Sequence, residues 1–199
     1  MAETKSVTNS AIYDRDTGAS SWQTNANNTS WVGNYSAVCL IFSSSAFNDI
    51  NPSSVQSVKC TLTYIGNSSK AVPIDVYTGE PLFDGDSTEV PSRCTLYSSG
   101  ELVTIAGNYK ENDLTTTLSG SSSQNLVSDL KNGDAIYLYS SSGSTANVQK
   151  ITLEITYSSL NIYAYSSGWK QAKEVYVYDN GWKKASTIYG YNGGWGQSS

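Results

Sequence analysis

The sequence predicts an all-β protein, in which an antiparallel β-sandwich is followed by a short aromatic β-repeat tail. Two segments carry the prediction of a sandwich, Ser57–Tyr64 and Ile151–Tyr157, because apolar and polar residues alternate along them. A period of two is typical of antiparallel strands that bury one face and expose the other. The tail is predicted from a pattern of Tyr, Gly and Trp that recurs at a fixed spacing near the C-terminus.

The alternation also assigns the buried faces of the two strands. Seven further apolar segments are weaker strand candidates, and clusters of Gly, Ser, Asn and Asp separate them. About nine strands punctuated by turns predict two packed sheets. The residues expected to face inward are Val58, Cys60, Leu62 and Tyr64 in the first strand, and Ile151, Leu153, Ile155 and Tyr157 in the second. The weaker candidates are Val7–Tyr13, Ala37–Phe42, Val72–Tyr77, Cys94–Tyr97, Leu102–Ala106, Leu114–Leu118 and Ala135–Tyr139.

One short helix is expected after the seventh strand candidate of the chain. Ser123 is a candidate N-cap, the apolar residues Leu126, Val127 and Leu130 share one face, and Gly133 would end the helix. A helix of about two turns suits a plug over one end of a sandwich.

The segment from Tyr13 to Asn34 is rich in Ser, Thr and Asn and predicts a long loop that carries Trp22 and Trp31. Long loops in compact domains are usually functional or disordered. Exposed tryptophans would favour a binding role. A tryptophan that packs a loop onto its own sheet is the commoner case, and packing is the prediction for both residues.

The tail repeats every 13 residues, at Tyr163, Tyr176 and Tyr189 and again at Trp169, Trp182 and Trp195. We therefore divide the chain into a sandwich over residues 1–158 and a three-unit repeat over 159–199. Each unit reads as a short strand, a tight turn and a tryptophan that begins the next strand. The turns Asp179-Asn180-Gly181 and Asn192-Gly193-Gly194 supply the positive φ angles that hairpins need.

One such unit is too small to bury its own rings, so the units must pack on each other or on a partner. Two interpretations stay open, because the same amphipathic rings serve both. The rings pack on one another or on a neighbouring protein subunit, or the tryptophans form platforms for sugar rings. The candidate glycan-binding or partner-binding residues are Trp169, Trp182, Trp195, Tyr163, Tyr176, Tyr178 and Tyr189.

Charge argues against nucleic acid as a partner. Of the 12 Lys and Arg and 17 Asp and Glu, the tail contains four Lys, one Glu and one Asp, which leaves 8 basic and 15 acidic residues in residues 1–158. Phosphate contacts need clustered basic residues, and an acidic body lacks them. The mildly basic tail is compatible with an anionic polymer.

Catalysis is disfavoured because the chain has no histidine. Serine and cysteine hydrolase triads and histidine-containing zinc sites are thereby excluded, and no glycine-rich phosphate loop precedes a helix. A two-carboxylate glycosidase is disfavoured as well. We expect no cofactor. The densest acidic segment offers a weak calcium candidate in Asp84, Asp86 and Glu89, with a solvated loop as the preferred interpretation.

The three cysteines cannot all pair within one chain, and Cys39 and Cys60 lie in apolar runs typical of strands. Reduced, buried thiols are therefore expected. The N-terminus shows no apolar signal-peptide segment, and no stretch approaches the roughly 18 apolar residues of a membrane span. We accordingly expect synthesis in the cytoplasm, with release only by an outside route such as cell lysis, and no membrane span.

The strand pattern resembles that of DNRLRE-like jelly-roll modules over about residues 6–158. The opening Ala37–Phe42 and Val55–Tyr64, and the close at Leu114–Leu118 and Lys150–Tyr157, match that family's rhythm. The acidic and basic positions that the family has near its first strands are largely missing. The resemblance implies an antiparallel jelly-roll β-sandwich of a kind found in cell-surface and phage tail proteins and often regarded as carbohydrate-binding.

The tail resembles the short Trp-Lys repeats that end many tail and minor structural proteins of phages infecting Gram-positive bacteria. The matching residues include Trp169–Ala172, Val175–Val177 and Trp182–Ala185. The rhythm is also similar to that of choline-binding cell-wall repeats, but the period here is shorter, so choline recognition is not carried over. Neither resemblance supplies catalytic residues.

Two non-enzymatic functions follow as hypotheses. The first is a phage or prophage virion structural protein of the tail, baseplate, fibre or head decoration. Such a protein would reside in the virion, contact other virion proteins, form a homo-oligomer and attach to the host surface, where it could bind a bacterial cell-surface glycan. The alternative is a carbohydrate-binding module of a secreted bacterial surface protein.

Overall fold

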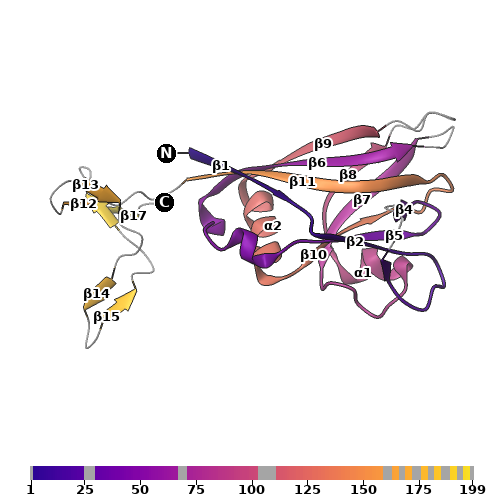
Figure 1. Ribbon diagram of the computed structural model, residues 1–199, viewed down its shortest axis with the longest axis horizontal. Coiled ribbons are helices and arrows are strands. Elements are labelled where there is room, and N and C mark those ends of the chain that lie inside the picture. The colour runs from indigo at the N-terminus through magenta and orange to yellow at the C-terminus, as the bar shows by residue number, and fades with distance from the viewer. Residues whose placement is uncertain are drawn as a thin grey trace.

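Two antiparallel β-sheets lie face to face and form the body of the protein (Figure 1). The computed structural model describes residues 2–24, 30–66, 71–102 and 111–158, together with six three-residue strands between positions 163 and 197. The predicted antiparallel sandwich is confirmed.

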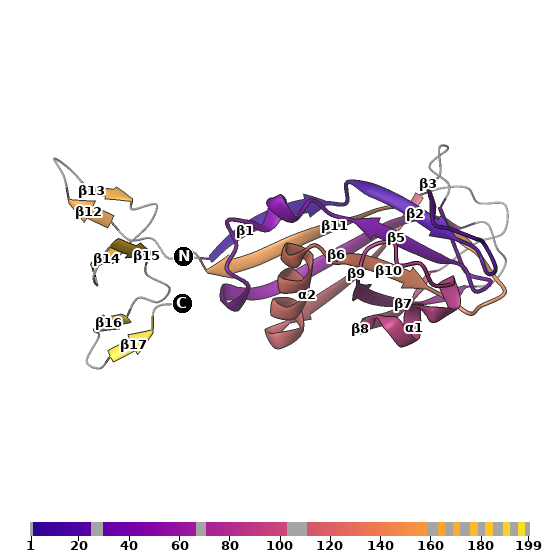
Figure 2. The ribbon, with the colours of Figure 1, turned by 90° about the horizontal axis from the view of Figure 1, so that it is seen from below.

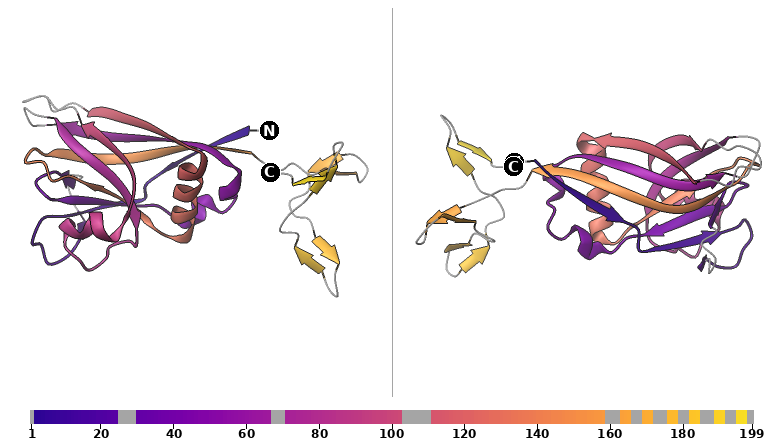
Figure 3. Two further views of the ribbon diagram at one scale, coloured as in Figure 1. Left: turned by 180° about the vertical axis from the view of Figure 1, so that it is seen from behind. Right: turned by 45° about the horizontal axis from the view of Figure 1, so that its top comes forward.

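The first sheet has five strands. Its path runs β1 (Ala2–Thr8), β11 (Ala146–Ser158), β6 (Val55–Gly66) and β9 (Glu111–Ser119), and the short strand β4 (Ser30–Val32) also pairs with β11. Strands β6 and β11 are the two longest and pair along almost their whole length, with Leu62 opposite Ile151 and Val58 opposite Ile155. They form the spine of this sheet, as Figure 3 shows from two sides.

The second sheet has six strands, each antiparallel to its neighbour. Their order is β3 (Gln23–Thr24), β2 (Ala11–Arg15), β5 (Ala37–Ile41), β10 (Ala135–Tyr139), β7 (Val72–Gly79) and β8 (Thr95–Leu102).

The main core fills the space between the sheets. Alternate residues of β6 and β11 face it, and Val58, Leu153 and Ile155 are fully buried there against Leu40 and Leu138 of the opposite sheet. The inward faces predicted from the alternation are confirmed. Cys60 shares that face but is only half-buried.

A second, smaller core covers the outer face of the six-stranded sheet. Residues 80–94 fold back over this face and place Phe83 and Val90 on Tyr137 of β10. Trp22 joins the cluster, with its ring centroid 5.4 Å from that of Tyr137, and its indole N–H donates to the Phe83 carbonyl oxygen at 2.8 Å. The packing role predicted for Trp22 is thus confirmed. Because both faces of β5 and β10 are covered, both strands are almost continuously buried.

The expected helix is α2 (Gly120–Asn132), which is longer than predicted because it starts at Gly120 rather than near Ser123. Its apolar face is buried, and Gly133 ends it in the left-handed conformation at φ 104°. Figure 2 shows α2 beside the end of the sandwich where β1 begins. The short helices are η1 (Ser44–Phe47), η2 (Pro52–Ser54), η3 (Ser87–Glu89) and α1 (Val90–Arg93). Within the residues that the structure describes, no helix is long and apolar enough to cross a membrane.

Three predicted segments differ from the observed elements. Val7–Tyr13 is split between β1 and β2, because the chain leaves one sheet and enters the other. Residues 95–97 of the segment predicted at Cys94–Tyr97 and the first residue of Leu102–Ala106 belong to one strand, β8, and residues 103–106 lie outside the described residues. The predicted loop Tyr13–Asn34 contains the short strands β3 and β4.

The tail contains three two-stranded antiparallel hairpins. In each repeat the second Tyr of the first strand pairs with the Trp that begins the second strand, as in Tyr165 with Trp169. The predicted turns, including Asp179-Asn180-Gly181, lie outside the described residues. The hairpins are β12 (Tyr163–Tyr165) with β13 (Trp169–Gln171), β14 (Tyr176–Tyr178) with β15 (Trp182–Lys184), and β16 (Tyr189–Tyr191) with β17 (Trp195–Gln197).

Candidate functional site

A tight turn carries the chain from one sheet to the other at a corner of the sandwich. This corner turn, Gly33–Ser36, joins β4 of the five-stranded sheet to β5 of the six-stranded sheet. The Ser36 amide donates to the Gly33 carbonyl oxygen at 2.9 Å and closes the turn. Both central residues have positive φ, 52° at Asn34 and 63° at Tyr35, as type I′ turns require.

Gly33 lets a second loop approach the corner turn closely. A β-carbon at this position would lie 2.0 Å from the carbonyl oxygen of Ser144, and the residue has φ 113°. Only glycine fits there, because both the backbone conformation and the space exclude a side chain. The amides of Asn34 and Tyr35 then donate to the carbonyl oxygens of Ser142 and Ser140.

A third loop, after β2, is bonded to the other side of the corner turn. Asp16 accepts a hydrogen bond from the Ser36 hydroxyl at 2.6 Å, and the Thr17 hydroxyl donates to the Tyr35 carbonyl oxygen at 3.1 Å. The Ser87 hydroxyl donates to the same carbonyl oxygen at 2.7 Å. Three separate segments therefore hold the turn in its left-handed conformation.

The corner turn, strand β4 and the loops after β2 and before β11 border an open cavity of about 320 Å³, which we call the corner cavity. A volume of this size is at the lower end of the range typical for small-ligand sites. The half-buried Trp31 supplies an aromatic surface, and the other lining residues supply hydroxyl, amide and carboxylate groups. The lining residues are Asp16, Thr17, Trp31, Asn34, Ser36 and Thr145.

The charged groups at and beside the corner cavity are carboxylates. Burial first, and the neighbouring Asp16 carboxylate second, raise the pKa of Asp14, whereas a hydrogen bond from the Trp31 backbone partly opposes the rise. The lining residues that the structure describes include no basic side chain. An anionic ligand would therefore be repelled, and a neutral ligand rich in hydroxyl groups would find both donors and acceptors.

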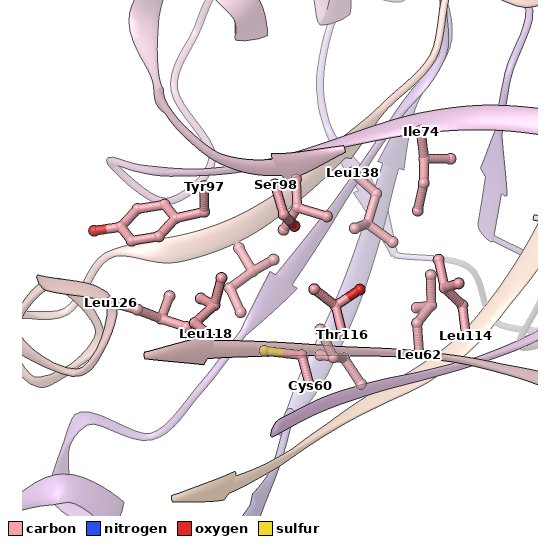
Figure 4. A pocket seen from close by; sticks show the side chains of 13 residues that line it. Cys60, Leu62, Ile74, Tyr97, Ser98, Leu114, Thr116, Leu118, Leu126 and Leu138 are labelled. Carbon is pink, nitrogen blue, oxygen red and sulfur yellow. The ribbon is translucent and has the colours of Figure 1, made fainter. Parts of the chain in front are cut away.

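A second, apolar cavity lies between the sheets near the edge strands β8 and β9 (Figure 4). We call it the inter-sheet slot. It has a volume of only about 30 Å³, and side chains of both sheets, such as Leu62 and Leu138, point into it. A space of that size holds about one or two water molecules, so it is a gap in packing rather than a ligand site.

All three cysteines are free, as predicted. Burial raises the pKa of both Cys39 and Cys60 to about 12, and that of the half-buried Cys94 to about 11. Thiols with such pKa values are almost wholly protonated at neutral pH and are therefore weak nucleophiles.

The three residues of the calcium candidate do not come together as ligands. Asp86 caps η3, where its carboxylate accepts from the Thr88 amide at 3.1 Å and from the Gly18 amide at 2.9 Å, and Glu89 completes the capping box. Asp84 pairs with Arg93 instead, at 3.2 Å. Among the residues that the structure describes, no group of three or more acidic or cysteine side chains could hold a metal ion.

The candidate residues of the tail all lie on described strands, but their side chains lie outside the described part of the structure. The strand register nevertheless relates the repeats to one another. Trp169, Trp182 and Trp195 each occupy the first position of a second strand. Their role as glycan or partner contacts stays a prediction.

No protein-family model matches the chain, and no curated protein sequence matches it. Several solved structures are similar in outline. A xylan-binding module, CBM15, is 10% identical with a TM-score of 0.43, over 78% of this chain and 97% of its own. A family 35 carbohydrate-binding module from Clostridium thermocellum is 10% identical with a TM-score of 0.34, over 77% of this chain and 97% of its own.

An exo-β-1,3-galactanase from Phanerochaete chrysosporium is also similar, at 11% identity and a TM-score of 0.36. The match covers 76% of this chain but only 29% of the galactanase chain. Identities and TM-scores this low carry no argument about function, so the corner cavity is the feature from which a function can be argued.

Sequence reasoning missed most of the corner cavity. Trp31, for which packing is predicted, is half-buried and lines the cavity, so its packing role stays a prediction. The dipeptide Gly33-Asn34 directly after it is a turn signal that places this tryptophan beside a loop junction. Asp16 and Thr145 carry no comparable signal, because only the fold brings their loops together.

Proposed function

We propose that this protein is a non-catalytic carbohydrate-binding protein and that the corner cavity binds a neutral glycan. The observation that supports the proposal is the composition of one cavity of about 320 Å³, with Trp31 and five polar side chains from three separate loops. Sugars need this combination, because their C–H faces stack on aromatic rings and their hydroxyl groups require hydrogen-bond partners.

The roles of the lining groups follow from their chemistry. Trp31 supplies the stacking surface. Asp16 and Asn34 offer oxygen acceptors for sugar hydroxyl groups, and Thr145 offers a group that both donates and accepts. Because the backbone of the corner turn is fixed by bonds to three segments, little ordering is needed when a ligand binds.

The test is direct binding of the full chain to a panel of neutral glycans, based on glucose, xylose, galactose and N-acetylglucosamine, each as a monosaccharide and as short oligomers. We expect Trp31→Ala to weaken binding at least tenfold, which corresponds to about 1.4 kcal/mol. Trp22→Phe is the matched control, because Trp22 packs on Phe83 and Tyr137 away from the corner cavity. The proposal is wrong if no panel member binds, or if Trp31→Ala binds as tightly as the unaltered chain.

A bacterial surface is the setting that we propose for this binding, either as part of a secreted surface protein or as a component of a phage virion. The repeated hairpins support a second contact with a surface or a neighbouring subunit, because each unit pairs an aromatic strand with a tryptophan-led strand. Replacing Trp169, Trp182 and Trp195 together by Ala in the full chain tests this contact in a pull-down with purified bacterial cell walls. Detection of the chain in purified phage particles by mass spectrometry would favour the virion.

A further inference from the structure

The lining of the corner cavity includes one carboxylate, and a buried hydroxyl group holds it in place. The Ser36 hydroxyl donates to Asp16 Oδ1 at 2.6 Å, and Ser36 is only 5% exposed. Asp16 itself is exposed where it lines the cavity. Within the described part of the chain, its carboxylate has no ion-pair partner and no hydrogen-bond donor other than Ser36. The negative charge of Asp16 is therefore available to a ligand in the cavity.

The loops around the corner cavity supply no basic residue that could offset this charge. Residues 16–36 and 140–147 contain neither Lys nor Arg. The basic residue closest to Asp16 in the sequence is Arg15, which is buried and does not line the cavity. Its Nη1 donates instead to the carbonyl oxygen of Asp84 at 3.2 Å. A positive charge at the site would therefore have to come from the ligand.

Two groups that attract a cation share the corner cavity. Asp16 would accept a charge-assisted hydrogen bond from an ammonium group, and such bonds are roughly twice as strong as neutral ones. Trp31 lines the same cavity, and the face of an indole ring attracts a nearby cation. Repulsion from Asp16 is, after burial, the next cause that raises the pKa of Asp14, so a cation beside this pair would relieve the repulsion.

We infer that the corner cavity prefers a sugar with a free amino group, such as a hexosamine, over the same sugar with a hydroxyl or N-acetylamino group in that place. This inference rests on the proposed function. A neutral glycan binds through Trp31 and the hydroxyl contacts, and the amino group adds a charged contact with Asp16. Because Asp16 is exposed, we expect a gain in affinity of about tenfold.

The experiment uses the methyl glycosides of glucose and galactose, each with a hydroxyl, an amino or an N-acetylamino group at carbon 2. Their affinities for the full chain are measured by titration calorimetry at mildly acid pH, where the amine is protonated. The amino form of the sugar that fits should bind about ten times more tightly than its two neutral counterparts. This ratio should fall towards one as salt is added, because ions screen the charged contact. Ethanolamine, which has an ammonium group but no sugar ring, should not displace the amino sugar.

Asp16→Asn tests the carboxylate, and Asp49→Asn is the matched control. Each variant removes one negative charge, but Asp49 pairs with Lys5 and does not line the corner cavity. The readout is the ratio of affinities for the amino and hydroxyl forms, which a general loss of affinity does not change. Asp16→Asn should lower this ratio from about ten to about one, and Asp49→Asn should leave it near ten.

Three results would overturn the inference. In the first, neither amino form binds the unaltered chain more tightly than its neutral counterparts. In the second, Asp16→Asn keeps the ratio, or Asp49→Asn lowers it equally. In the third, ethanolamine displaces the amino sugar, so that the cavity binds ammonium groups in general. These results are distinct from failure of the proposed function, in which no neutral glycan of the panel binds or Trp31→Ala has no effect.

Discussion

The corner cavity and the inter-sheet slot are both spaces in the same sandwich, yet they arise in opposite ways. The inter-sheet slot is lined mainly by aliphatic side chains of two sheets whose edges do not fully close, and it holds only about 30 Å³. The corner cavity is built by loops that approach through a glycine and two left-handed residues, and it holds about 320 Å³. The inter-sheet slot is therefore a gap left by imperfect side-chain packing. The corner cavity lies between loops, which carry binding residues more often than strands do.

This difference predicts that stability and binding can be changed separately. Leu138, fully buried beside the inter-sheet slot, should govern stability alone. Leu138→Ala should lower the free energy of unfolding by about 3 kcal/mol, because it removes buried methyl groups and enlarges an existing gap. Urea unfolding measures the loss, and glycan affinity at a temperature where the variant is folded should be unchanged. A parallel loss of binding would mean that the two cavities are coupled.

Gly33→Ala should affect both properties, because it forces the Ser144 backbone away from the corner turn. We expect a loss of about 2 kcal/mol in stability, together with loss of glycan binding. Gly120→Ala is the control, since Gly120 also has positive φ, 58°, but a β-carbon there meets nothing within 4 Å. If the two variants lost equal stability and both bound glycan, the close approach would not be needed for the site.

The smallest expected effect is on the stability of the protein at acid pH. Hydrogen bonds from the Thr88 and Gly18 backbone lower the pKa of Asp86 below its usual 3.8. The folded state therefore favours the ionised form, and this contribution is complete above pH 3.8 and is lost as the pH falls through the lowered value. Asp86→Asn keeps a capping side chain but cannot titrate. Urea unfolding should show that stability falls less between pH 6 and pH 3 in this variant than in the unaltered chain.

An equal fall in the variant and the unaltered chain would assign the acid sensitivity to other groups. Asp49 is one such group, because the hydrogen bond from Lys5 lowers its pKa. Asp49→Asn, measured in the same way, separates the two contributions.

The sandwich could be predicted from the sequence because apolar and polar residues alternate along each long strand, and this alternation indicates which face of the strand is buried. Alternation at Ile151–Tyr157 identified a buried face without any knowledge of its partner. The same reasoning fails for Ala37–Ile41 and Ala135–Tyr139, where alternation disappears because residues 80–94 cover the outer face. The division of Val7–Tyr13 was missed because the apolar pattern continues while the chain changes sheet.

The corner cavity could not be predicted in the same way. Asp16, Trp31 and Thr145 are far apart in the sequence and meet only because β2, β4 and β11 end or begin at the same corner. The cost of positive φ at Tyr35 is also invisible in the sequence, since nothing before folding marks that residue as left-handed. Polar loop residues are too common to single out a site until the fold has placed them.

Strand β11 has a mechanical consequence. Its 13 residues run from Ala146, beside the corner cavity, to Ser158, where the chain leaves the sandwich, a length of about 40 Å. A molecule tethered by its tail and holding a ligand at the corner would be loaded along this strand. Its ladders with β6 and β1 run parallel to that tension, so many backbone bonds would resist in shear together instead of opening one after another.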